Sequence, residues 1–133
     1  MDNQIERCKY RMKKSHENYI TAELLLKEGD YDTALNRAYY SIFHIINALL
    51  ILDNLNFKSH SAVIAKFRET YIKTNIFDKN MSVIIGGLFE DRNDSDYTDF
   101  FWASKEDAEI QVENAKIFID RIKPYIEKRI ENL

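Results

Sequence analysis

The chain has 133 residues, of which 45% are hydrophobic and 31% are charged, so it can build a core and is too apolar to be disordered. A net charge of −3 excludes a protein that coats nucleic acid through bulk electrostatics, so any contact with RNA or a nucleotide needs a local basic site. Only three glycines and one proline are available for turns, which favours a few long helices in a single domain over residues 1–133.

The first two predicted helices carry most of the apolar pattern. One stripe runs in steps of three and four residues from Ile5 to Leu26 and predicts a long first helix. Asp30 can cap the second helix, whose segment Tyr39–Leu52 is apolar on nearly every side. This segment is shorter than the ~20 residues of a membrane span, and two polar residues interrupt it. We therefore predict a core helix and no membrane insertion.

Three further helices complete the predicted fold. Ser59 or Ser61 can cap a short third helix, and a fourth runs to the Arg92 region. Ser104 begins a capping-box pattern that opens the last helix, in which Pro124 predicts a kink or the final turns. The sequence thus predicts an all-α, up-and-down antiparallel bundle of four main helices plus one short helix.

Several kinds of chemistry find little support in the sequence. Cys8 falls on the first helical stripe and indicates a buried thiol in a reducing cytoplasm. The first residues lack the apolar segment of a secretory signal, which also favours a cytoplasmic protein. Three scattered histidines give no metal-binding spacing, so we predict no metal and no cofactor. Gly86-Gly87 lacks the flanking residues of a phosphate loop and indicates a close helix approach or a local kink.

Arg92 occupies an unusual position for a charged residue. Met81, Ile85 and Leu88 step by four and three residues, and the next step of four reaches Arg92. A guanidinium on an apolar stripe needs a partner, because an unpaired buried charge is costly. The partner is Asp96, another chain, or an anion such as phosphate.

A second group of polar residues follows the central helix. Asn36, Tyr40, His44 and Asn47 step by four, four and three residues, and so form a ridge on an otherwise apolar helix. They are either core polar groups that bond within the protein, or a ridge that faces a cleft and hydrogen-bonds a substrate.

Three motifs together resemble the HEPN domain (higher eukaryotes and prokaryotes nucleotide-binding). They are Asn36-Arg37-Ala38-Tyr39-Tyr40-Ser41-Ile42-Phe43-His44, then Ser59-His60-Ser61, then Arg92-Asn93-x-x-Asp96-Tyr97. The resemblance implies an up-and-down helical bundle that forms a symmetric homodimer. It also implies a metal-independent ribonuclease that acts on RNA. Prokaryotic members are often encoded beside a small nucleotidyltransferase partner and act as the toxin of a toxin–antitoxin pair.

The resemblance carries over residue by residue at the third motif. Arg92 matches the family arginine and Asn93 the polar residue that often follows it. Tyr97 stands where the family's ribonucleases place histidine, and Asp99 stands where toxin members place tyrosine. The Arg-x-x-x-Asp-Tyr form, which includes Asp96, resembles a subgroup of the family. Tyrosine exchanges protons poorly at neutral pH, whereas histidine exchanges them well.

Two functional hypotheses follow. The first is a ribonuclease toxin with Arg92, Asp96 and Tyr97 as its catalytic residues, in which His44 or His60 can supply proton transfer if the fold brings it to the cleft. The second is a non-catalytic subunit that binds a nucleotide or the nucleotidyltransferase. The residues that we predict to bind RNA or a nucleotide are Asn93, Asn36, Tyr40 and His44.

Overall fold

The computed structural model describes residues 3–97 and 103–133, and for residues 91–97 it describes the backbone alone. Within these ranges the chain is all-α, as predicted, and contains no strand. The helices are α1 (Asn3–Glu28), α2 (Tyr31–Leu52), α3 (His60–Phe67), α4 (Lys79–Tyr97) and α5 (Lys105–Glu131), with a π-helical turn η1 (Arg68–Ile72) directly after α3.

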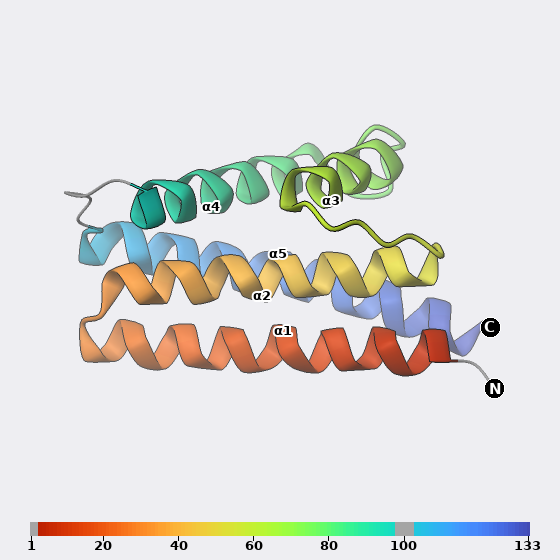
Figure 1. The fold of residues 1–133 in the computed structure, drawn as a ribbon, viewed down its shortest axis with the longest axis horizontal. Helices are drawn as coiled ribbons and strands as arrows, with labels where there is room; N and C mark the ends of the chain where they lie inside the picture. Colours follow the sequence, from red (N-terminus) through yellow and green to blue (C-terminus); the bar gives the residue numbers. More distant parts are fainter. Residues whose placement is uncertain (1–2, 98–102) are drawn as a thin grey trace.

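The long helices form an up-and-down bundle with α2 at its centre. In Figure 1, α1 lies on one side of α2, α3 and α4 lie on the other, and α5 runs behind. The last helix packs against α1, α2 and α4. The start of α1 and the end of α5 meet at one end of the bundle, and the last turns of α4 lie at the opposite end (Figure 1).

Local capping places the helix boundaries close to the predicted positions. The Asp30 side chain accepts a hydrogen bond from the backbone N–H of Thr33, and Ser104 caps α5 through the N–H of Asp107. Ser59, one of the two predicted candidates, caps α3 through the N–H of Ala62 at 3.0 Å. These side chains satisfy backbone donors that a helix N-terminus leaves without partners.

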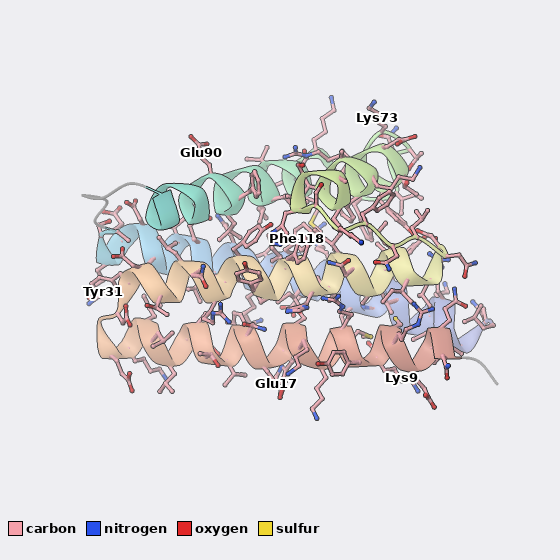
Figure 2. All side chains as sticks on the ribbon, viewed as in Figure 1. Lys9, Glu17, Tyr31, Lys73, Glu90 and Phe118 are labelled. Atoms are coloured by element: carbon pink, nitrogen blue, oxygen red, sulfur yellow. The ribbon has the colours of Figure 1, made fainter. Side chains whose placement is uncertain are left out.

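The core surrounds α2, because its apolar residues point in almost every direction. Phe118 of α5 lies between the two sides of the bundle in Figure 2, where its ring is 5.7 Å from the ring of Phe67 on α3. From α1 the fully buried residues are small: Cys8, Ser15 and Ala22. Small residues on α1 let it lie close to α2 along its length. The predicted burial of Cys8 is confirmed, and burial raises the pKa of its thiol to about 11.

Two features of α4 and α5 refine the sequence-based expectations. A side chain added at Gly87 would lie 3.3 Å from the Gln111 amide of α5, which confirms the predicted close approach of two helices. Pro124 lies inside α5, seven residues before the helix ends at Glu131, and so in the final turns that were one of its two predicted positions. The described residues contain no helix that is long and apolar enough to cross a membrane.

A polar network ties the end of α2 to η1 and α5. The Tyr71 hydroxyl donates to Asp53 at 2.5 Å, and Nη1 of Arg129 donates to both Asp53 and the Tyr71 oxygen at 2.8 Å. Burial and the Asp53 carboxylate raise the pKa of Tyr71 well above its usual range, so its hydroxyl keeps the proton that it donates. The predicted short third helix ends at Phe67, and the π-helical turn that follows it carries Tyr71.

Candidate functional site

The predicted catalytic segment forms the last turns of α4. Arg92, Asn93, Asp96 and Tyr97 all lie within this helix, and their side chains are outside the described residues, as is Asp99. Their catalytic and binding roles therefore stay predictions. The surroundings of the segment are described: Phe89, one turn before Arg92, has its ring 5.8 Å from that of Tyr39 on α2. The end of α4 thus lies beside the first half of α2 (Figure 1).

The predicted polar ridge lies on the least buried side of α2. Asn36, Tyr40 and His44 are each half-buried, and Asn47 is 8% exposed. The ridge is therefore neither core nor fully solvated. Its polar groups bond within the protein: the Asn47 amide donates to the carbonyl of Phe43, and Asn36 accepts from Arg37. A binding role for the ridge stays a prediction.

Arg37 organises the first part of the ridge. Its guanidinium donates to the Asn36 side chain through Nε and Nη2, and to Asn18 of α1 through Nη1 at 3.0 Å. It also lies over the Tyr40 ring, with Cζ 5.0 Å from the ring centroid. These partners are neutral, and among the described residues no carboxylate lies within 4.0 Å of Arg37, so its guanidinium is suited to an anion.

His44 is held as a neutral imidazole. Nη1 of Arg11 lies 2.9 Å from its Nδ1, and because arginine can only donate, Nδ1 accepts and the proton sits on Nε2. Burial, and then the positive charges of Arg11, Lys14, Arg37 and His60, lower the pKa of His44 to about 4. At neutral pH this side chain is a weak base, but its Nε2–H can donate to a phosphate oxygen.

His60 reaches the same face of the molecule from the first residue of α3. Its Nδ1 lies 2.8 Å from the hydroxyl oxygen of Tyr39, and its ring stacks on Phe43 with centroids 4.0 Å apart. The Tyr40 ring lies between the two histidines, 5.8 Å from His60 and 6.4 Å from His44. The fold therefore brings both histidines to the polar ridge, which the sequence alone could not establish.

Basic residues of α1 border the ridge, and sequence reasoning missed them. We call Arg7, Arg11, Lys14 and Arg37 the basic face. Within the described residues, no carboxylate comes within 4.0 Å of Arg7, Arg11 or Arg37, and only Lys14 forms an ion pair, with Glu17. On α1 these cations step by four and three residues, and α2 has no acidic residue between Asp32 and its end, a pattern that could have revealed the face.

No metal centre accompanies this face in the described part of the chain. There, no three His, Cys, Asp or Glu side chains gather closely enough to hold an ion. The chemistry that the described residues offer is anion binding by guanidinium groups, hydrogen bonding by amides and His44, and ring contacts with Tyr40.

The family model of the HEPN domain matches residues 8–125 of the chain. A UPF0332 protein of Thermotoga maritima is 32% identical over 118 residues, which cover 89% of this chain and 89% of the relative. Two proteins of Methanocaldococcus jannaschii, both named "Putative toxin", are 32% and 36% identical over 86% and 82% of this chain, and over 78% and 81% of their own lengths. The family match extends from the second turn of α1 to the last turns of α5.

Proposed function

Because the chain belongs to the HEPN domain family, as its motifs predicted, we propose that it is the RNA-acting toxin of a toxin–antitoxin pair and a metal-independent ribonuclease. Two relatives whose names describe them as candidate toxins support the toxin role. One structural observation supports the RNA role: the basic face borders the polar ridge of α2, and within the described residues no carboxylate lies within 4.0 Å of its three arginines. The α4 helix, which contains Arg92, packs against α2 as well.

In the proposed reaction the RNA supplies its own nucleophile. The 2′-oxygen attacks the neighbouring phosphorus and loses its proton, and the 5′-oxygen leaves with a proton, so that a 2′,3′-cyclic phosphate remains. The Arg92 guanidinium stabilises the charge that develops on the phosphate oxygens. Asp96 and Tyr97 are the groups that orient this guanidinium. Tyr97 is a poor proton carrier at neutral pH, so cleavage should be slow.

The proposal includes two protein partners. A second copy of the chain would place two Arg92 side chains across a twofold axis, where both contact one phosphate. A small nucleotidyltransferase would serve as the antitoxin. Light scattering at tens of micromolar, an order-of-magnitude concentration for a stable interface, should report a dimer, and a monomer would contradict this arrangement.

One observation favours a second candidate function. The histidine that the family's ribonucleases use is replaced by Tyr97, and the structure holds His44 as a neutral imidazole with a pKa of about 4. A chain with these groups can bind RNA or a nucleotide without cleaving it. The alternative is therefore a non-catalytic subunit that binds a nucleotide or the nucleotidyltransferase.

Cleavage of RNA in the presence of EDTA separates the two functions. The proposed ribonuclease should cut single-stranded RNA slowly without metal and leave 2′,3′-cyclic ends, and Arg92→Ala should abolish the cleavage. Arg121→Ala is the matched control, because this exposed arginine pairs with Asp78 on the surface. Binding without cleavage supports the second candidate. Cleavage that chelator stops would contradict the mechanism.

A further inference from the structure

A hollow lies between α1, the end of α2 and the loop that follows. Its volume is about 260 Å³. A water molecule takes up about 30 Å³ of liquid, so the hollow has room for a phosphate group together with part of a sugar. It is lined by Arg7, Tyr10, Arg11, Asn47, Ile51 and Asn56. Two guanidinium groups and two amides therefore face one small space.

Among the described residues, no acidic side chain pairs with the two arginines of this hollow. The lining contains no acidic residue, and within the described chain neither Arg7 nor Arg11 has a carboxylate within 4.0 Å. Arg11 bonds instead to the neutral His44. Asp53 is close in sequence, but its two oxygens are occupied by Arg129 and Tyr71. An arginine pair whose charge nothing offsets is suited to an anion.

The lowered pKa of His44 supports a positive electrostatic potential beside the hollow. After burial, the charges of Arg11 and Lys14 are the largest causes of its lowered pKa. A position that disfavours an imidazolium because of surrounding cations favours a phosphate for the same reason. His44 contacts Arg11, which lines the hollow, so the lowered pKa of His44 reflects positive charge at the hollow itself.

We propose that the hollow binds a phosphate group, with Arg7 and Arg11 contacting its oxygens and Asn56 donating from the loop. The site goes beyond the proposed ribonuclease centre, because it lies at the end of α2 and the start of α1, whereas the Arg92 segment ends α4 at the other end of the bundle (Figure 1). The phosphate belongs either to an RNA backbone or to a free nucleotide, which the same guanidinium chemistry recognises.

A charge-removal experiment tests the site. The double variant Arg7→Gln/Arg11→Gln is compared with Lys9→Gln/Lys13→Gln, which removes two charges from the outer side of α1, where Lys9 points away from α2 (Figure 2). Anisotropy of a labelled single-stranded oligoribonucleotide of about 20 nucleotides is measured at several salt concentrations. The arginine variant should bind roughly tenfold or more weakly, with a salt slope smaller by about 0.7 per lost phosphate contact.

A second variant and a second ligand make the result decisive. Asn56→Asp places a carboxylate in the hollow and leaves both arginines intact, so it should weaken binding even if loss of Arg11 disturbs the fold. ATP, titrated by calorimetry, forms the nucleotide arm. Weaker RNA binding assigns the site to RNA, and loss of ATP binding alone assigns it to a nucleotide. The proposal is overturned if neither ligand responds, or if the lysine variant weakens binding equally.

The same measurements separate this site from the proposed function. If the arginine variant of the hollow binds like the parent while Arg92→Ala loses RNA, the hollow is not a phosphate site and the ribonuclease proposal stands. If the hollow variants lose RNA while the parent never cleaves it, the phosphate site stands without the nuclease.

Discussion

Nη1 of Arg11 lies 2.9 Å from Nδ1 of His44, which joins a cation of α1 to the ridge of α2. The contact requires the neutral imidazole, since a protonated ring has no acceptor for an arginine N–H. The pair therefore links the charge state of one histidine to the packing of α1 against α2, the most extensively packed pair of helices among the described elements.

This contact predicts a pH dependence of stability. His44 has a pKa of about 4 in the folded protein against an ordinary value of 6.5. Between these values the unfolded chain binds a proton that the folded chain does not, so stability falls as pH decreases from 6.5 and the loss is complete near 4. Urea unfolding at pH 7.5 and 5 should show a smaller decrease for His44→Gln than for the parent.

His16→Gln serves as the control for that experiment, because His16 is an exposed histidine on α1. It should follow the parent at both pH values. An equal pH dependence in His44→Gln and the parent would show that the Arg11 contact does not hold His44 in its neutral form.

Substitutions of Arg92 should act on ligand binding and leave the fold intact. Arg92→Ala should weaken RNA binding by roughly tenfold or more, since charge-assisted hydrogen bonds contribute about 1.5–3 kcal/mol. Arg92→Lys should restore little, because an ammonium cannot reproduce the bidentate guanidinium fork. Anisotropy gives the affinity and thermal unfolding gives the stability. Variants that bind like the parent but melt much lower would make Arg92 a structural ion-pair residue.

Replacing Tyr97 by histidine should increase cleavage. The substitution supplies a group that exchanges protons near neutral pH, and acid–base catalysis of this kind contributes at least on the order of tenfold. Single-turnover cleavage of a labelled RNA in EDTA measures the effect, with Tyr97→Phe as the matched control. A parent that already turns over at about 1 s⁻¹ or faster would show that this position needs no histidine, and would direct mutagenesis to His44 and His60.

Removal of the Tyr71 hydroxyl should destabilise the protein. Tyr71→Phe leaves Asp53 without one donor and Arg129 without one acceptor in a half-buried network, which costs about 1–3 kcal/mol. Chemical denaturation measures the loss, and Tyr10→Phe, at a tyrosine that is 57% exposed, is the control. Equal stabilities of the two variants would mean that water replaces the hydroxyl at no cost.

Local signals explain what the sequence predicts well. Asp30, Ser59 and Ser104 each cap a helix through the backbone N–H three residues further along the chain, so spacing along the chain is enough to find them. The glycine at position 87 predicts that another helix approaches α4 closely. It does not predict that this helix is α5, because that depends on packing between segments far apart in the sequence.

The candidate site shows the opposite case. Tyr40 and His44 share a helical face and could be grouped from sequence, whereas His60 joins them only because the loop before α3 returns along α2. Arg11 lies on α1, and its contact with His44 joins residues that are 33 positions apart in the sequence. Spacing along the chain can suggest the cations of the basic face, but it does not predict which of them contacts His44, because that contact depends on the fold.

The start of α1 and the end of α5 lie at the same end of the bundle, and this has a practical consequence for surface-based binding measurements (Figure 1). Capture of the protein through a tag at its last residue would turn the start of α1, with Arg7, toward the sensor and leave the end of α4 facing the flowing sample. Capture through a biotin attached to a cysteine in place of Glu90, which points outward from α4 in Figure 2, would turn the molecule the other way. The orientation of the immobilised protein thus becomes a means to present one end of the molecule at a time.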